Sequence, residues 1–318
     1  MDGIVAVTYR CNCKCLMCDT WKHPSPKGGE ILPRHLEKLP RLTRLNITGG
    51  EPFIREDLDE ILGVVKKKAK RVVISSNGLL TSRILDVMGR HRDVGIRLSF
   101  DGVGETHDAI RGVRGSHDRA LETLRGLKSL GIRDLGIAVT ISDRNAGELV
   151  PLFALARREG VELATAILHN AYYFHKEDNE IRDKALVGEG IEGLIRAYLA
   201  SSSPKDWFRA YFTRGIVEHM HGRQRPLKCT MACDSFFVDP YGLLRPCNVM
   251  DFPFGNLGEA GFDAIWNGPQ AAEARRRVAC CPSNCWMIGS VGHLMRQQVW
   301  SPFAWIVRNK WLGHPEAA

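Results

Sequence analysis

The chain lacks the features that define several classes of protein. Its 318 residues contain no run of about 18 apolar residues, so no membrane-spanning helix is predicted. No charged leader with an apolar core and a cleavage site follows Met1, which predicts a cytoplasmic protein without a secretory signal. Aromatic residues make up only 8% of the chain. With 44% hydrophobic and 25% charged residues, the composition is that of a folded protein, with one large domain or a large and a small one.

Acidic residues are outnumbered by basic ones, 36 against 44. Part of the excess lies in residues 66–71, which we expect to close a helix, where the helix dipole favours cations. No basic stripe with interleaved aromatics accompanies this run, so no nucleic-acid partner is predicted. A mild attraction for anionic small molecules or anionic lipid stays open.

Cysteine is missing from the middle of the chain, although there are ten cysteines in all. Disulfides are rare in the cytoplasm, and a disulfide-stapled domain would spread its cysteines along the sequence. Two separate clusters indicate two metal sites instead. The clusters comprise Cys11, Cys13, Cys15 and Cys18 near the start, and Cys229, Cys233, Cys247, Cys280, Cys281 and Cys285 near the end.

Between the clusters, short β-branched segments alternate with longer amphipathic ones, which is typical of βα units around a parallel sheet. Six such strands predict an α/β fold with a partial (β/α)6 TIM-like barrel, open on one side. The strands are expected near 3–8, 43–48, 71–75, 95–100, 135–141 and 162–168, and the helices near 33–39, 55–69, 81–91, 116–130 and 145–158.

Beyond this core we predict helices near 185–200 and 206–221, a hairpin over 236–247 and a short helix near 261–278. The chain is therefore divided into three parts. Residues 1–225 form the barrel, with a core at 3–168 and a helical connector. Residues 226–290 form a small extension, and residues 291–318 form a helical tail.

The first cluster places Cys11, Cys15 and Cys18 as CxxxCxxC directly after the first strand, at the end of the sheet where parallel α/β proteins carry chemistry. Three thiolates at this spacing can ligate three irons of a [4Fe–4S] cluster and leave the fourth iron open. A zinc site would need a fourth ligand, for which Cys13 or His23 is available.

Polar or glycine-rich turns follow the next three strands at the same rim. Gly49-Gly50-Glu51-Pro52 offers a close backbone approach beside a carboxylate able to bind an ammonium group. Residues 75–78 read Ser-Ser-Asn-Gly and residues 99–102 read Ser-Phe-Asp-Gly. Together with the cysteine loop, these turns predict one ligand site at the carboxyl ends of the strands.

This set of motifs resembles the radical S-adenosylmethionine (radical SAM) superfamily, whose partial barrel agrees with the strand count. The resemblance implies that a [4Fe–4S] cluster on Cys11, Cys15 and Cys18 binds SAM. Reductive cleavage then gives a 5′-deoxyadenosyl radical, which abstracts a substrate hydrogen, with flavodoxin or ferredoxin as the external electron donor. The SAM-binding residues implied are Met17 near the adenine, Gly49, Gly50, Glu51 and Pro52 for the amino group, Ser76, Asn77, Ser99 and Asp101 for the ribose, and Arg111 for the carboxylate.

The second cluster resembles the SPASM or shortened twitch extension, which binds auxiliary iron–sulfur clusters. The cysteines suffice for one auxiliary [4Fe–4S] cluster. The ligands implied are Cys229, Cys247, Cys281 and Cys285. Cys233 and Cys280 are left over as small buried residues or substitute ligands, and Cys233 is also a candidate catalytic hydrogen donor.

The segment after the sixth strand leaves it at the open rim and is expected to contact the substrate. Its candidate contacts are His169, Asn170, Tyr172, Tyr173, His175 and Lys176. Because the first strand begins near residue 3, with no module before it to bind a leader peptide, we predict an oxidoreductase or epimerase acting on a small polar, carbohydrate-like molecule. The alternative is a maturase of a peptide or protein side chain, and a remote one is a non-catalytic iron–sulfur or zinc scaffold.

The C-terminal stretch combines aromatics with cations, among them Arg296, Trp300, Trp305, Lys310 and Trp311. This combination is found in helices that lie on a membrane surface. The competing interpretation is an ordinary terminal helix packed on the flank of the barrel.

Overall fold

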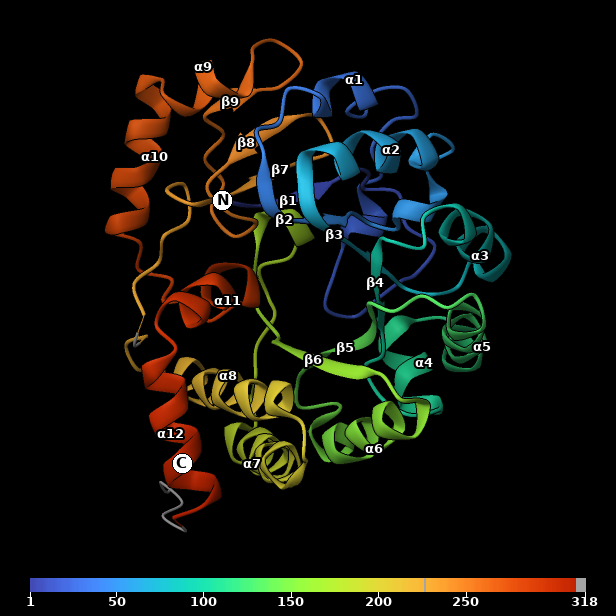
Figure 1. Ribbon diagram of the computed structural model, residues 1–318, viewed down its shortest axis with the longest axis vertical. Coiled ribbons are helices and arrows are strands. Elements are labelled where there is room, and N and C mark those ends of the chain that lie inside the picture. Colours follow the sequence, from blue (N-terminus) through green and yellow to red (C-terminus); the bar gives the residue numbers. More distant parts are fainter. Residues whose placement is uncertain (226, 313–318) are drawn as a thin grey trace.

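A computed structural model describes residues 1–225 and 227–312 (Figure 1). Its centre is a sheet in which six parallel strands stand side by side in chain order. The first strand pairs on its other side with a later segment and not with the sixth, so the six strands form the expected partial (β/α)6 barrel. The strands are β1 (Asp2–Ala6), β2 (Leu42–Thr48), β3 (Ala69–Ser76), β4 (Gly95–Ser99), β5 (Leu135–Ile141) and β6 (Glu162–Ile167).

Helices cover the outer face of this sheet (Figure 1). Because side chains alternate along a strand, one set of residues packs under the helices and the other set faces the inside of the barrel. Ile47, Ile74 and Leu98 belong to the outer set and are fully buried. The covering helices are α1 (Pro33–Leu36), α2 (Leu58–Lys68), α3 (Thr81–Arg90), α5 (Ser116–Ser129) and α6 (Leu149–Glu159).

One further helix, α4 (Glu105–Arg111), lies where a loop was expected. Flanking glycines hide it from the sequence pattern, since Gly104 and Gly112 both adopt positive φ angles. The helix supports the first cysteine loop through hydrogen bonds from Lys14 N to Arg111 O (3.0 Å) and from Leu16 N to Ile110 O (2.9 Å). A Cβ on Gly112 would collide with the Lys14 carbonyl, so this close approach requires glycine.

The C-terminal third continues the central sheet. After α7 (Lys184–Ala200) and α8 (Pro204–Met220), the predicted hairpin forms as β7 (Ser235–Val238) and β8 (Leu243–Arg245), followed by β9 (Gly255–Asn256). β7 also pairs in parallel with β1, from Asp2 opposite Ser235 to Val5 opposite Val238. This pairing, which joins the hairpin to the barrel, was not anticipated from the sequence.

The helix predicted near 261–278 is in fact two helices, α9 (Phe262–Trp266) and α10 (Pro269–Ala279), because Gly268 and Pro269 interrupt it. Cys280 follows directly as the C-cap residue of α10. The tail forms α11 (Ile288–Gln297) and α12 (Trp300–Lys310). Within residues 1–225 and 227–312, no helix is long and apolar enough to cross a membrane.

Candidate active site

The carboxyl ends of the barrel strands surround a cavity of about 230 Å³. The cysteine loop forms one wall, and turns after β2, β3 and β4 form the others. The structure thus gathers at one place the rim motifs that lie far apart in the sequence. Among the lining residues are Cys11, Cys15, Cys18, Met17, Gly49, Gly50, Ser76, Asn77, Ser99 and Arg111.

Polar groups point at the three thiols of this loop. Asn77 Nδ2 lies 3.9 Å from Cys11 Sγ, Arg111 Nη1 lies 3.7 Å from Cys15 Sγ, and Cys18 Sγ lies 2.9 Å from Thr20 Oγ1. Burial raises the pKa of the Cys18 thiol to about 11, so a thiolate there needs a nearby positive charge such as a metal.

Three thiols beside a cavity, with N–H donors aimed at two of their sulfurs, fit an iron–sulfur cluster. No three His, Cys, Asp or Glu side chains in the described part of the chain gather closely enough to hold a single metal ion. Cys13 also lines the cavity but is only 2% exposed.

The glycine pair contributes backbone to the cavity wall. Gly50 N donates to Thr8 O (2.7 Å) and Glu51 N donates to Arg10 O (2.8 Å), which holds this turn against the end of β1. A Cβ on Gly49 or Gly50 would collide with these same carbonyl oxygens. The two glycines therefore allow the turn to press against the cysteine loop while its backbone faces the cavity.

Glu51 does not face the cavity, contrary to its expected role toward an ammonium group. The side chain is fully buried, and its carboxylate accepts hydrogen bonds from Phe53 N (3.2 Å), Ser76 Oγ (2.9 Å) and Asn77 N (2.7 Å). Burial raises its pKa to about 7. Glu51 thus fixes the Ser76–Asn77 turn from behind, and Pro52 is likewise buried without lining the cavity.

Asp101 also stands behind the wall and not at a ribose position. It is fully buried, accepts a hydrogen bond from Thr140 N (2.8 Å) and pairs with Arg111 Nη2 at 2.6 Å. Burial raises the pKa of Asp101, and the Arg111 guanidinium opposes this shift. Through this ion pair, Asp101 orients Arg111, which reaches both the cavity and Cys15.

Two of the six substrate-contact candidates, His169 and Tyr173, line the cavity. His169 Nδ1 lies 2.9 Å from Ile167 O and must donate to it, because a carbonyl only accepts. Nε2 therefore carries the lone pair, and it is buried without a partner in the described residues. Burial lowers the pKa of His169, which favours a neutral imidazole.

The other four candidates are engaged elsewhere. Asn170 bonds to Asn179, and Lys176 Nζ pairs with Asp178 at 2.7 Å. His175 is exposed beside the ring of Tyr9, and the Tyr172 ring packs against the guanidinium of Arg245. None of the four lines the cavity.

Sequence reasoning missed Trp21 and Phe174, which line the same cavity. Trp21 lies three residues after Cys18, and its indole N–H is buried without a partner in residues 1–225 and 227–312. Phe174 follows Tyr173 and packs against the His169 ring at 5.0 Å. Only their nearness in sequence to predicted residues could have signalled them.

The second cysteine cluster brings together four thiols. Burial, with the charges of Cys247, Cys281 and Cys229, raises the pKa of Cys285 to about 12. Met250 N donates to Cys247 Sγ at 3.3 Å, as is common for iron–sulfur ligands. Burial likewise raises the pKa of Cys247 to about 11. Four partly buried thiols from three segments fit a cluster held by protein ligands alone.

Cys233 and Cys280 are exposed, not buried as small apolar residues. Cys233 precedes β7, whose first residue pairs with Asp2 at the start of β1. The cysteine loop instead follows the end of β1, so Cys233 lies at the opposite end of the parallel strands from the cavity. This position contradicts its expected role as a hydrogen donor to the substrate.

Contacts with the helical connector hold the last cysteines in place. Trp286 is 1% exposed, and its Nε1 donates to Phe212 O on α8 at 2.7 Å. A Cβ on Gly215 would overlap this indole, so glycine makes room for it. Arg225 Nη1 donates to Cys285 O at 2.9 Å.

Family models match both halves of this arrangement. The radical SAM superfamily model matches residues 5–156, and the SPASM model, an iron–sulfur cluster-binding domain, matches residues 229–287. The chain belongs to the radical SAM superfamily and carries a C-terminal SPASM domain. It is a radical SAM enzyme that uses SAM, a SAM-binding [4Fe–4S] cluster and auxiliary [4Fe–4S] chemistry.

Several curated proteins are similar over most of the chain. Pre-heme d1 synthase of Dinoroseobacter shibae is 27% identical over 312 residues, covering 88% of this chain and 76% of that protein. The subtilosin biosynthesis protein AlbA of Bacillus subtilis is 26% identical, covering 90% and 65%. The mycofactocin maturase MftC of Mycobacterium ulcerans is 26% identical, covering 90% and 79%.

Solved structures share the fold. The enzyme anSMEcpe with bound AdoMet matches with a TM-score of 0.65 at 16% identity, covering 88% of this chain and 83% of that one. Streptococcus suis SuiB bound to S-adenosylmethionine matches with a TM-score of 0.63 at 14% identity, covering 89% and 71%.

Proposed function

We propose that this radical SAM enzyme is a maturase that modifies a side chain of a peptide or protein. The observation that carries the proposal is the similarity to AlbA and MftC, which extends over 90% of the chain. These comparisons do not support the carbohydrate-like substrate expected from the sequence. They favour the alternative, a maturase of a peptide or protein side chain.

The bound cluster and SAM supply the 5′-deoxyadenosyl radical. In this proposal Cys11, Cys15 and Cys18 hold that cluster, and Cys229, Cys247, Cys281 and Cys285 hold the auxiliary one. Gly49 and Gly50 offer backbone to the amino group of SAM, while Ser76, Asn77 and Ser99 offer polar groups to its ribose. Arg111, held by Asp101, pairs with the carboxylate of SAM.

We assign His169 to the substrate. Its Nε2 lone pair is buried at the cavity, with Nδ1 fixed on the Ile167 carbonyl. Net oxidation of a substrate carbon removes a hydrogen atom, which goes to the 5′-deoxyadenosyl radical, and then an electron and a proton. The auxiliary cluster would accept the electron, and the neutral imidazole of His169 can accept the proton. The aromatic rings of Tyr173 and Phe174 exclude water beside it.

The test uses the anaerobically reconstituted enzyme with reductant, SAM and deuterated peptides encoded by short reading frames beside its gene. Deuterium in 5′-deoxyadenosine, with matching loss of hydrogen mass from one peptide, is the expected result. His169→Ala should keep SAM cleavage but lower modified peptide per 5′-deoxyadenosine by about tenfold or more. Tyr172→Phe, outside the cavity, is the matched control. Failure of every peptide to donate deuterium would overturn the proposal.

A second candidate substrate is a haem-related tetrapyrrole, favoured by the similarity to pre-heme d1 synthase. Deuterium transfer to 5′-deoxyadenosine from a deuterated porphyrin, in place of transfer from a peptide, distinguishes this candidate.

A further inference from the structure

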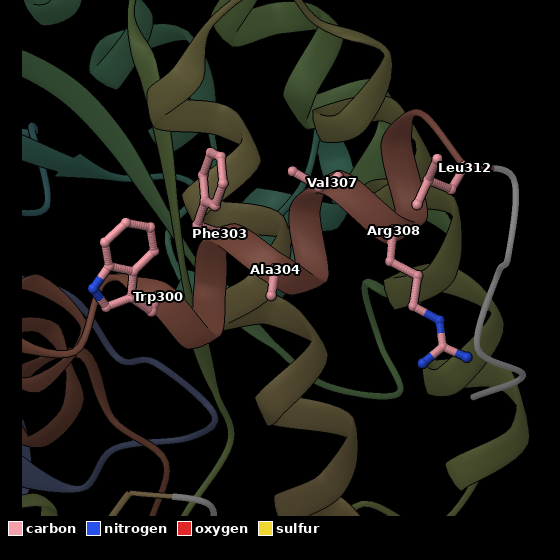
Figure 2. Close-up of a pocket in the computed structure, with 6 residues that line it drawn as sticks. All are labelled: Trp300, Phe303, Ala304, Val307, Arg308 and Leu312. Carbon is pink, nitrogen blue, oxygen red and sulfur yellow. The ribbon is translucent and has the colours of Figure 1, made fainter.

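The C-terminal stretch makes several contacts within the molecule, as expected of an ordinary terminal helix. The ring of Trp311 packs against that of Trp207 on α8 at 5.2 Å. Arg296 on α11 pairs with Asp2 at 3.0 Å. Trp300 is exposed on the outer side of α12 (Figure 2). Nothing in residues 1–225 or 227–312 identifies an occupant of this side, so we assign it no role.

Thr20 stands where the first cysteine loop meets the wall of the cavity. It begins a short 3-10 helix (Thr20–Lys22), lines the cavity and is only 2% exposed. Its Oγ1 lies 2.9 Å from Cys18 Sγ and 3.2 Å from Tyr173 O. A single hydroxyl is thus placed between a thiol of the loop and the backbone of the segment that follows β6.

The hydroxyl of Thr20 has one hydrogen and can donate it only once. When Cys18 is a thiol, both contacts are satisfied, because S–H donates to Thr20 Oγ1 and O–H donates to Tyr173 O. When Cys18 is a thiolate that ligates iron, its sulfur can only accept. A hydrogen bond to an ionised acceptor is about twice as strong as one between neutral groups. The hydroxyl therefore turns to the sulfur when the cluster is bound.

This turn does not release the segment after β6. Asp19 N still donates to Phe174 O at 2.9 Å. Asn179 Nδ2 still donates to Met17 O at 3.0 Å. Only the Tyr173 carbonyl loses its donor, and a neutral group without a partner costs less than a buried charge without one. The rearrangement is therefore confined to one hydrogen bond.

The other two sulfurs of the loop have longer contacts of this kind. Arg111 Nη1 lies 3.7 Å from Cys15 Sγ, and Asn77 Nδ2 lies 3.9 Å from Cys11 Sγ. Thr20 thus makes the shortest of the three contacts, at a position that water does not reach. Its removal should therefore have a measurable effect on the cluster.

We propose that Thr20 sets the reduction potential of the SAM-binding cluster by donating its hydroxyl hydrogen to the Cys18 thiolate. Reduction adds one electron from an external donor, and part of the added negative charge falls on the ligating sulfurs. A hydrogen bond to a sulfur stabilises the reduced cluster more than the oxidised one, so it raises the potential. Thr20 acts through Cys18 and takes no part in breaking the bond of SAM.

The test is an anaerobic redox titration of the reconstituted full chain without SAM, read by electron paramagnetic resonance. The signal that changes when SAM is added to a reduced sample identifies the SAM-binding cluster. Thr20→Val keeps the branched shape of the side chain and removes the hydroxyl. At a fixed potential, we expect its ratio of reduced to oxidised SAM-binding cluster to be lower by about three- to tenfold, where tenfold is about 59 mV for one electron.

Thr20→Ser is the matched control, because it keeps the hydroxyl and should titrate like the wild type. The auxiliary cluster in the same samples is a second control, and its potential should not change. The proposal is overturned if Thr20→Val titrates like the wild type, if Thr20→Ser shifts as far as Thr20→Val, or if both clusters shift equally.

Electron–nuclear double resonance in D2O gives an independent measurement. The reduced SAM-binding cluster of the wild type and of Thr20→Ser should show a strongly coupled exchangeable deuteron, which Thr20→Val should lack. If the wild type shows no such deuteron, the proposal fails whether or not Thr20→Val assembles its cluster.

Discussion

The two cysteine regions gather their thiols in different ways. The first takes its three thiols from one loop, residues 11–18, and lays them along the wall of a cavity of about 230 Å³. The second collects four thiols from segments as far apart as Cys229 and Cys285. A single loop approaches a cluster from one side and leaves room for a ligand, whereas converging segments surround it. The path of the chain around the thiols therefore distinguishes a reactive cluster site from an enclosed one.

The two cysteine regions are also held in place by different kinds of contact. Backbone hydrogen bonds from Lys14 and Leu16 to α4 hold the first region, while side-chain hydrogen bonds of Trp286 and Arg225 hold the second. Backbone contacts persist through most substitutions. The second region should therefore be the more sensitive of the two to mutation.

Cys15→Ala should break the first region completely. Without one of three thiolates the open cluster is lost, so reductant-dependent formation of 5′-deoxyadenosine should fall to background, while roughly half of the iron remains in the second region. Iron content and product analysis measure both. Cys13→Ala, in the same loop, is the control and should keep activity. Normal activity of Cys15→Ala would refute the assignment.

Cys247→Ala should instead spare the first region. About half of the iron should be lost, with SAM cleavage retained and substrate modification impaired. Cys233→Ala and Cys280→Ala serve as controls, because both thiols are exposed, and each should keep its iron. If Cys280→Ala loses the second cluster and Cys281→Ala does not, the ligand assignment is wrong.

Trp286→Phe probes the supporting side chains of the second region. The change removes the bond from Nε1 to Phe212 O and leaves a small cavity against Gly215. We expect a loss of about 1–3 kcal/mol in the free energy of unfolding and faster release of auxiliary iron to a chelator. Trp300→Phe, at an exposed position, should change neither. Equal rates of iron release from the two variants would contradict the inference that the Trp286 side chain holds the second cysteine region in place.

Glu51→Gln should have the smallest effect. Burial raises the pKa of Glu51 from 4.5 to about 7, so ionisation costs more in the folded state than in the unfolded state. The contribution of Glu51 to the free energy of unfolding is therefore fully present below about pH 4.5 and is lost as the pH rises through about 7. The thermal midpoint of the wild type should therefore fall over this window more than that of the variant.

The affinity for SAM distinguishes a structural role of Glu51 from direct contact with SAM. Since its carboxylate does not line the cavity, Glu51→Gln should change SAM affinity only a few-fold. Anaerobic titration with SAM measures this. Abolished binding at unchanged stability would show that the carboxylate contacts SAM after all.

The sequence predicted the six strands and the rim because both depend on local patterns. Apolar runs mark the strands, and glycine and polar residues mark their ends. It did not reveal which way the rim side chains point. Glu51 and Asp101 lie within motifs that face the cavity, yet both carboxylates turn inward to bind Ser76 and Arg111. Such orientation depends on partners 25 or 10 positions away in the chain, which no local pattern encodes.

Long-range pairing was hidden for the same reason. The hairpin at β7 and β8 was expected, but its alignment with β1 joins segments more than 200 residues apart. α4 was missed because its glycine boundaries resemble a loop. In both cases contacts with the rest of the molecule decide the structure, and the intrinsic preference of the segment does not.

The pairing of β7 with β1 has a consequence for any attempt to shorten this protein. A chain ending before Cys229 would leave the backbone N–H and C=O groups of Asp2–Val5 without their partners along one side. An exposed strand edge of this kind is a template for intermolecular pairing and aggregation. The SPASM segment is thus also a protective cover for the barrel, and an isolated barrel would need a replacement strand or solubilising charges to stay monomeric.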